Sequence, residues 1–317
     1  MLFAAMALLF YALLLSDYGN RGQSLVYGIG FSFSMFCLIT NISHEAAHGV
    51  LCRSPRLNSL IHSAVFSLSG VNARLWKLRH NAAHHPFPNV PSCDADVDHN
   101  PVLKLHPDNR HYAHFRFQHL YAPFAYIVGM LHAFIIQDII YLRKNKLANL
   151  ENIQSTWIDI VGFVTAKITY ALVWIVLPWV ILPYSNGHIL FGCFLCSAFM
   201  ALAFLPIICT HFCEECSLPS LNETGNLKGS SIAHQLAASM DFSTSSLLAR
   251  FVYGGLNLHA AHHLYPWVSH AYYPAITQMI KHQTERYGLP YNQQTLCGVL
   301  CSHFRLLKTL GERSVNC

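Results

Sequence analysis

The sequence predicts an all-α integral membrane protein with about four transmembrane helices in two hairpins and a helical cytosolic cap. Three observations support this fold class. Hydrophobic residues make up 53% of the 317 residues and charged residues only 11%, whereas soluble domains contain about a quarter charged residues. The longest apolar stretches occur in two pairs, and histidine-rich segments lie beside them.

The predicted spans are residues 1–15, 25–42, 158–183 and 188–210. A helix needs about 20 apolar residues to cross the hydrocarbon core. The second pair is long enough, and we expect the helices of the first pair to continue past their strictly apolar runs. A signal peptide is the alternative for residues 1–15, but no Lys or Arg precedes that run and no small-residue cleavage signal follows it.

Two further apolar stretches, residues 59–71 and 120–141, are predicted to form helices that lie in the membrane interface. A crossing by residues 120–141 would separate histidine clusters that need to meet on one side. Of the 20 Lys and Arg residues, all but Arg21 and Lys167 lie in residues 43–157 or 211–317. The positive-inside rule therefore places these two segments and both termini on the cytosolic side of the membrane. We expect residues 1–317 to form a single domain. The net charge of +5 includes no dense basic run, so nucleic acid is not an expected partner.

Histidine is the unusual residue, with 21 copies in the chain. Residues three or four apart lie on one face of a helix, so histidines at that spacing can converge on one ion. Eight imidazoles are too many for one metal ion, and the clusters therefore predict a site for two ions on the cytosolic face. The candidate ligands form three clusters: His44 and His48; His80, His84 and His85; and His259, His262 and His263.

The ligand type alone does not identify the metal, because imidazole binds zinc, copper, iron and nickel. An uncharged ligand set leaves the metal charge available for oxide or peroxide, which favours oxygen activation over a structural zinc site. The alternative is a membrane zinc metalloprotease, because His44-Glu45-Ala46-Ala47-His48 also matches the pattern His-Glu-x-x-His. That alternative leaves the other cluster histidines without a role.

Polar residues near the clusters are candidates for orienting the imidazoles, with helix capping or a solvated role as the alternative for each. These candidates are Glu45, Asn81, Asn257 and Asp241. We expect Asp94, Asp96 and Asp98 to form a solvated loop, with pairing to guanidinium or imidazole as the alternative.

With their neighbours, these motifs resemble the membrane fatty acid desaturase family, nearest its front-end and linoleoyl-CoA desaturase branch. The resemblance extends from about residue 41 to residue 310. It includes residues 76–85 with Asn89 and residues 94–96, and residues 118–123, 234–235, 254–257, 263–266, 273–276 and 289–292.

This resemblance implies an O₂-dependent oxidoreductase of lipid metabolism with two iron ions, which desaturates a fatty acyl chain carried on CoA, a carrier protein or a lipid. It implies that the eight cluster histidines bind iron, together with a further histidine at the end of the fourth span. His211 fits that place better than His234, because the span anchors its backbone. A hydroxylase, acetylenase or ketolase on the same scaffold is the alternative.

Two departures from the family pattern affect these expectations. The front-end branch usually has Gln where this chain has His259, which leaves the regioselectivity open. The sequence contains no His-Pro-Gly-Gly haem motif. The expected electron donor is therefore a separate ferredoxin, rubredoxin or cytochrome b5-type protein with its reductase.

Overall fold

The computed structural model describes the whole chain except residues 18, 145, 152 and 313–317. It divides into two compact units. The membrane unit comprises residues 1–76, 126–144 and 154–204, and the histidine unit comprises residues 77–125, 145–153 and 205–317. Because the boundaries fall inside α5, α6 and α10, these three helices belong to both units.

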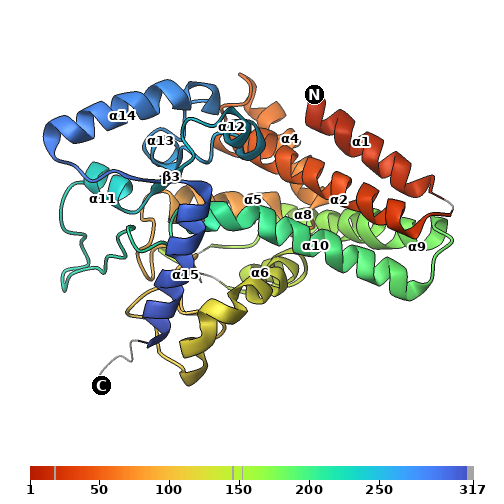
Figure 1. The fold of residues 1–317 in the computed structure, drawn as a ribbon, viewed down its shortest axis with the longest axis horizontal. Helices are drawn as coiled ribbons and strands as arrows, with labels where there is room; N and C mark the ends of the chain where they lie inside the picture. The colour runs from red at the N-terminus through yellow and green to blue at the C-terminus, as the bar shows by residue number, and fades with distance from the viewer. Residues whose placement is uncertain (18, 145, 152, 313–317) are drawn as a thin grey trace. The chain divides into compact units, whose positions relative to one another are not determined.

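The membrane unit consists of helices (Figure 1). They are α1 (Leu2–Leu15), α2 (Arg21–Leu38), η1 (Ile39–Ser43), α3 (His44–His48), α4 (Pro55–Leu68), α5 (Ala73–Lys77), α6 (Gln118–Ile135), α7 (Gln137–Arg143), α8 (Trp157–Ala171), η4 (Leu172–Val176), α9 (Leu177–Ile181) and α10 (Asn186–Cys209).

Among the described residues, three continuous helical segments are long and apolar enough to cross a membrane: Arg21–His48, Trp157–Ile181 and Asn186–Cys209. The pair Ala113–Ile135 and Gln137–Arg143 passes the same test as a unit but bends by 53°, and Leu2–Leu15 is a shorter apolar helix. The predicted all-α membrane fold class is therefore confirmed. That residues 1–15 span the membrane, and that residues 59–71 and 120–141 lie in the interface, stay predictions.

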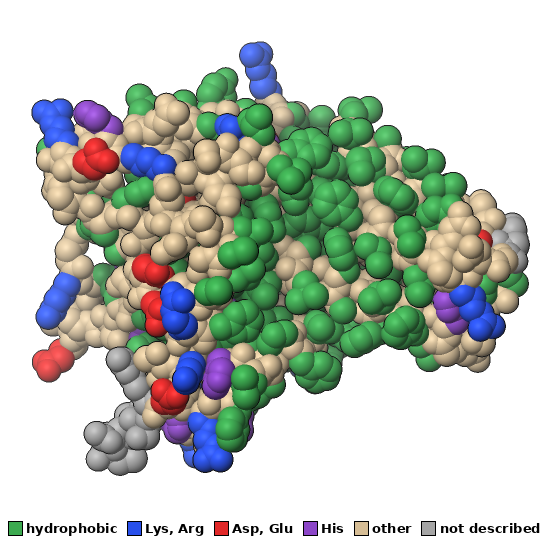
Figure 2. Space-filling model, viewed as in Figure 1, with side chains coloured by type: hydrophobic (Ala, Val, Ile, Leu, Met, Phe, Trp, Pro, Cys, Tyr) green, Lys and Arg blue, Asp and Glu red, His purple; other side chains and the backbone are tan. Residues whose placement is uncertain are grey.

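The outer surface of these helices is apolar, as expected of side chains that contact lipid. Exposed hydrophobic residues lie along α8 and α10, among them Ile158, Val161, Leu190 and Phe191. Figure 2 shows hydrophobic side chains covering a broad area of the surface over α2 and α10. No water is available in the hydrocarbon region, so the backbone must be satisfied internally, which helices achieve.

Polar groups in the membrane unit are joined in a network. Lys167 of α8 donates from Nζ to the carbonyl oxygens of Gly70 (2.5 Å) and Phe134 (2.6 Å) and to Oδ2 of Asp138 (2.9 Å). The same Asp138 oxygen accepts from the backbone N–H of Asn72 at 2.9 Å. This network ties α8 to the bend between α6 and α7 and to the loop before α5.

In the part of the chain that the structure describes, three helical segments are π-helical: η1, η4 and η2 (Leu78–His84). A π-helix has a wider turn than an α-helix and is frequent at functional sites. The turn in η1 directly precedes His44, and η2 carries His80 and His84. The wide turn also brings together residues five apart, so that Nε2 of His85 lies 3.1 Å from Nε2 of His80.

The histidine unit combines short helices with two small sheets. Its remaining elements are η3 (Ala113–Phe117), β1 (Lys146–Leu147), β2 (Leu150–Glu151), α11 (Ser231–Ala237), β3 (Met240–Phe242), α12 (Leu247–Tyr253), α13 (His259–Leu264), η5 (His270–Tyr272), α14 (Tyr273–Tyr287), β4 (Asn292–Gln294) and α15 (Leu296–Glu312). Strands β1 and β2 pair antiparallel, and β3 pairs parallel with β4 in the register Met240 to Asn292.

Two close contacts hold η3 against α15. Gln118 donates from Nε2 to the carbonyl oxygen of Leu307 at 2.6 Å. At Gly311, an added Cβ would come within 2.1 Å of the carbonyl oxygen of Phe115, so only glycine fits there. The buried core beneath α13 and α14 includes Leu236, Leu258 and Tyr273. This core anchors the short helix α13, which carries the third histidine cluster.

Candidate metal centre

The histidine unit gathers candidate ligands from three separate segments of the chain. His80, His84 and His85 come from η2 and its end, His211 follows α10, and His259, His262 and His263 lie on α13. All of these side chains except His80 are buried. Two groups have ligand nitrogens within 4.8 Å of one another: His84 with His211 and His263, and His85 with His262 and His263.

His211 lies between His84 and His259. Its Nε2 is 3.1 Å from Nε2 of His84 and 2.7 Å from Nε2 of His259. Residues 84, 211 and 259 are therefore brought together although they are far apart in the sequence. His234, the other candidate for the additional ligand, is half-buried, lines a pocket with Phe87 and Lys228, and belongs to none of the groups of metal-ligating side chains found among the described residues.

The second nitrogen of several of these rings is held by an oxygen atom. Nδ1 of His84 contacts Oδ2 of Asp94 (2.9 Å). Nδ1 of His211 contacts the carbonyl oxygen of Ala238 (2.9 Å), and Nδ1 of His259 contacts that of Leu256 (3.1 Å). Carboxylate and carbonyl oxygens only accept hydrogen bonds, so each Nδ1 must carry the proton. Each Nε2 then presents a lone pair toward its neighbours.

The same arrangement applies to His263. Its Nδ1 contacts Oε1 of Gln235 at 3.0 Å. The amide of Gln235 is oriented by its Nε2, which donates to the carbonyl oxygen of His85 at 2.8 Å. Within the described part of the chain, Nε2 of His263 is buried and has no hydrogen-bond partner.

Facing lone pairs repel unless a proton or a metal ion lies between them. Burial, with the neighbouring His259 and His84, holds the pKa of His211 well below its ordinary value. Burial, with His84, lowers the pKa of His259 to about 3, and burial with the neighbouring histidines lowers that of His263 as well. The rings of His211, His259 and His263 are therefore neutral at neutral pH, and no proton relieves the repulsion between His211 and His259. The donor set therefore fits metal ions, since neutral imidazole is the form that binds them.

The pair of His84 and Asp94 behaves differently. Burial alone would lower the pKa of His84, but the nearby Asp94 carboxylate raises it overall. Burial alone would raise the pKa of Asp94, yet His84 and the backbone N–H groups of Asp96 and Asn89 hold it below its ordinary value. Asp94 is thus an ionised carboxylate that fixes the orientation of an imidazole, an arrangement common behind metal-bound histidine.

This geometry corrects one expectation. Asp94 does not belong to a solvated loop: it is 0% exposed, and the alternative of imidazole pairing is confirmed. The physical reason is local. Asn89 has φ +65°, and the chain from Asn89 to Asp96 turns back so that backbone N–H groups at both ends donate to the carboxylate. Asp96 is half-buried and Asp98 is exposed.

The predicted orienting residues contact backbone atoms. Asp241 accepts from the backbone N–H of Ala260 (2.8 Å) through Oδ1 and from the Tyr291 hydroxyl (2.7 Å) through Oδ2. Burial raises the pKa of Asp241 to about 6. Asn257 donates to the carbonyl oxygen of Phe242 at 3.1 Å. Both residues therefore position the start of α13. Glu45 is buried and Asn81 is half-buried.

Sequence reasoning missed Gln235 and Asn89 as individual contacts. Gln235 joins the second and third histidine clusters through His85 and His263. Asn89 donates from Nδ2 to the carbonyl oxygens of His211 (3.0 Å) and Ser217 (2.9 Å). The only available signal was that both residues fall in segments that resemble the desaturase family.

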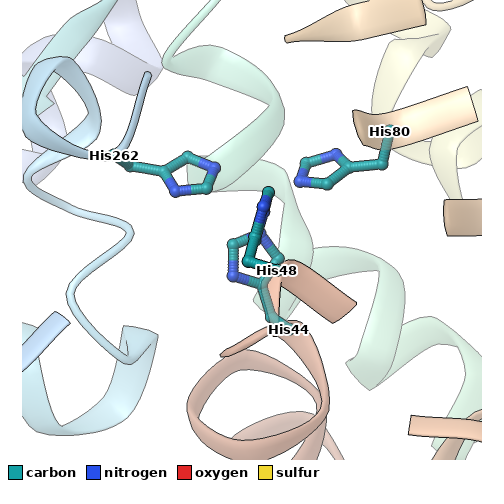
Figure 3. A group of neighbouring side chains, drawn as sticks. All are labelled: His44, His48, His80 and His262. Carbon is teal, nitrogen blue, oxygen red and sulfur yellow. The ribbon is translucent and has the colours of Figure 1, made fainter. Parts of the chain in front are cut away.

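The first histidine cluster belongs to the membrane unit. His44 and His48 lie one turn apart on α3, with ring centroids 4.7 Å apart, and the His44 ring is 6.2 Å from the Trp76 ring. Gly49, at φ +79°, ends the helix directly after His48. Figure 3 shows these two side chains at the end of their helix. Within the histidine unit, the rings of His80 and His262 are stacked with centroids 5.8 Å apart.

Comparison with known proteins agrees with this geometry. Residues 23–295 match the family described as fatty acid desaturase. The chain is 24% identical to the sn-1 linoleoyl-lipid 6-desaturase of Synechocystis over 86% of this chain and 77% of the relative. It is 29% identical to the acyl-lipid (8-3)-desaturase of Physcomitrium patens, over 91% of this chain and 60% of the relative. For the acyl-lipid (8-3)-desaturase of Mortierella alpina, the identity is 28%, over 91% and 65%.

The chain thus spans less than two thirds of the moss and fungal relatives that it matches. The match to the family nevertheless includes all three histidine clusters, His211 and the residues that hold their Nδ1 atoms. From the family match and the buried histidine groups, the chain belongs to the fatty acid desaturase family of membrane oxidoreductases.

Proposed function

We propose that this chain is an O₂-dependent fatty acyl desaturase that holds two iron ions at its cytosolic face. Its nearest alternatives, a hydroxylase, acetylenase or ketolase, would use the same ligands and differ in product. The proposed iron ligands are His44, His48, His80, His84, His85, His211, His259, His262 and His263.

This proposal rests on four histidine rings whose Nδ1 atoms donate hydrogen bonds to oxygen atoms of the protein. In His84, His211, His259 and His263, the proton is held on the outer nitrogen and Nε2 is left as the donor atom. A zinc protease built on His44 and His48 would give these four rings no role. The uncharged ligand set is instead suited to metal ions that also bind a reduced oxygen species.

Iron with O₂ would supply the oxidising power needed to remove hydrogen from an unactivated methylene group. The residues of this chain contribute orientation and the exclusion of water. Asp94 and Gln235 hold two of the rings in one tautomer, and burial of the histidines keeps bulk water from the site. We propose that His44 and His48 of the membrane unit also supply iron ligands.

The substrate in this proposal is a fatty acyl chain. Relatives named for linoleoyl-lipid and acyl-lipid substrates support a lipid-bound chain, with CoA and carrier-protein thioesters as alternatives. We propose that a ferredoxin, rubredoxin or cytochrome b5-type protein with its reductase delivers the electrons. The placement of Lys and Arg supports a cytosolic active site.

The test is to express the chain in a host and to analyse its fatty acids by mass spectrometry with localisation of the double bonds. New alkenes are expected, together with about two iron ions per purified chain. His84→Ala and His262→Ala should abolish the product while the protein remains in the membrane. His282→Ala is the matched control, because His282 is exposed.

Three results would count against the proposal. Hydroxylated or keto lipids without new alkenes would favour the alternative oxidations. Zinc with peptide-bond hydrolysis, and no iron, would favour the protease. Full activity in both the His84 and His262 variants would refute the ligand assignment.

A further inference from the structure

A pocket lies in the histidine unit, and none of its lining residues is a proposed iron ligand. Its volume is about 200 Å³, whereas a cavity needs only about 10–15 Å³ to hold one water molecule. The walls come from two segments of the chain. The segment after the second histidine cluster contributes Pro86 and Phe87, and the loop that leads into α11 contributes residues 227–231 and His234. The pocket is therefore large enough for a small polar group.

Three polar groups that can donate hydrogen bonds line this pocket without a protein partner. Nε2 of His234 is buried and unpaired among the described residues. The Lys228 ammonium and the Ser231 hydroxyl are exposed and form no ion pair or hydrogen bond within the described chain. The Ser230 hydroxyl, by contrast, accepts from the backbone N–H of Ala233 at 3.1 Å. Because buried polar atoms normally have a partner, the unpaired nitrogen of His234 indicates that this pocket receives a polar ligand.

The charge of the lining residues favours an anion. Among the described residues that line the pocket, Lys228 carries the only charge and none has a carboxylate. Burial lowers the pKa of His234, so its ring is neutral at neutral pH and Nε2 can donate a hydrogen bond. A phosphate group has several oxygen atoms, which can accept from an ammonium, a hydroxyl and an imidazole at the same time.

The loop before α11 is folded so that this space stays open. Oδ1 of Asn222 accepts from the backbone N–H groups of Thr224 (3.0 Å) and Asn226 (2.8 Å), which closes a turn before the pocket. Gly229 has φ +94°, in the region that favours glycine. An added Cβ at Gly229 would have no atom within 4 Å. The loop therefore passes the pocket without filling it.

The pocket adjoins the metal centre through the backbone. Pro86 directly follows His85 in the chain, and Gln235 directly follows His234. Nε2 of Gln235 donates to the carbonyl oxygens of His85 (2.8 Å) and Pro86 (3.4 Å). His234 is also close enough to His211 to contribute to the lowered pKa of that ring. A molecule whose polar end lies in this pocket is therefore held beside the proposed iron ligands.

We propose that this pocket binds the phosphate group at the polar end of the acyl substrate, with Lys228 as counter-ion and Ser231 and His234 as hydrogen-bond donors. The proposal rests on the proposed desaturase function and names the chemical group by which the substrate is held. Phospholipids and acyl-CoA both carry phosphate at that end, whereas galactolipids do not. Lys228 and His234 are positioning residues, which hold the polar end and take no part in the removal of hydrogen.

Equilibrium binding to the purified, iron-loaded protein tests the proposal. The probes are glycerophosphocholine, CoA and inorganic phosphate, with galactosylglycerol as the probe that lacks phosphate, and each is titrated by calorimetry. Glycerophosphocholine or CoA should bind, inorganic phosphate should compete, and galactosylglycerol should not bind. Binding of glycerophosphocholine but not CoA would identify a lipid head group, and the reverse would identify a CoA thioester. Binding of inorganic phosphate alone would overturn the proposal.

Substitutions in the pocket locate the binding. Lys228→Gln should weaken binding of the phosphate probes about tenfold because it removes a charged hydrogen-bond donor, and Lys228→Arg should retain most of the affinity. His234→Ala should weaken binding several-fold. Lys308→Gln is the matched control, because Lys308 is an exposed lysine of the same unit that pairs with Glu312. In turnover, Lys228→Gln should raise KM and leave kcat nearly unchanged. Thermal unfolding verifies that each variant is folded.

Binding that Lys228→Gln and His234→Ala leave unchanged would overturn the proposal. Binding that is lost in His84→Ala but retained in Lys228→Gln would also overturn it, because the phosphate would then be bound at the metal centre. Alkenes from a parent protein that binds none of the phosphate probes would reject this pocket and leave the proposed desaturation standing. Phosphate binding by a parent protein that makes no alkenes would reject the desaturation instead.

Discussion

Asp94→Asn tests the central argument about the metal centre. The carboxylate accepts from Nδ1 of His84 at 2.9 Å, and also from the backbone N–H groups of Asn89 (3.0 Å) and Asp96 (2.9 Å). Asparagine has nearly the same volume, but it carries no charge and one of its two polar atoms is a donor. Either His84 or a backbone N–H then faces another donor, and the preference for a proton on Nδ1 is weakened.

The expected loss follows from the position of Asp94 behind a ligand. Removing such a partner typically lowers metal affinity about 10- to 100-fold, which corresponds to about 1.4–2.8 kcal/mol. A buried donor left without its acceptor costs a further ~1–3 kcal/mol of folding stability. The variant should therefore bind iron more weakly, and the metal-free protein should also melt at a lower temperature.

Iron retained per chain, measured during dialysis against increasing chelator, gives the change in affinity. Thermal unfolding of the metal-free proteins gives the change in stability separately. Asp98→Asn is the matched control: Asp98 is exposed and accepts from the backbone N–H of Ser92, so its variant should behave like the parent. An Asp94→Asn protein that keeps the parental affinity for iron would refute the tautomer argument.

Three further changes have defined outcomes. Gln235→Leu removes the acceptor for Nδ1 of His263, and iron affinity measured by chelator competition should fall about tenfold or more. Lys167→Met leaves Asp138 buried without its cation, which should destabilise the protein by about 3–5 kcal/mol in thermal unfolding. Burial lowers the pKa of His303 from 6.5 to about 4. As the pH falls from 6.5 toward 4, the unfolded chain therefore binds a proton at this residue while the folded protein does not, and the free energy of unfolding decreases. His303→Gln should reduce the loss of stability between pH 7 and pH 5 by about 2 kcal/mol.

Each change has a control. Gln235→Glu keeps the acceptor for Nδ1 of His263 but loses the donor to the carbonyl oxygen of His85, so it should recover only part of the iron affinity. Lys146→Met breaks only an exposed ion pair with Glu151, which is expected to contribute less than about 1 kcal/mol. His282→Gln removes an exposed histidine and should leave the pH dependence unchanged. Equal effects in a variant and its control would contradict the corresponding prediction.

The sequence by itself determined the membrane class, the longer spans and the histidine clusters. These features are local, because an apolar run and a spacing of three or four residues report directly on helices. The apolar runs at residues 158–183 and 188–210 correspond closely to the segments Trp157–Ile181 and Asn186–Cys209. A pair such as His44 and His48 needs only one helical turn to converge, so its pattern is visible without a fold.

Only the tertiary structure decided which atoms hold those histidines. The partner of His211 is a backbone carbonyl 27 residues away, at Ala238, and every residue type carries such a group. Asp94 was misassigned for a similar reason. A carboxylate in a polar loop has the same sequence pattern whether it is solvated or buried, and the difference depends on how residues 89–96 turn back.

The π turns and the apolar pocket beside η4 were also invisible in the sequence. A π turn changes the hydrogen-bond register without a distinct residue pattern. The pocket exists because Gly28, Gly192 and Trp174 come from three helices that pack together. Local periodicity therefore reveals the elements and their reactive side chains, whereas cavities and backbone partners arise only where distant segments meet.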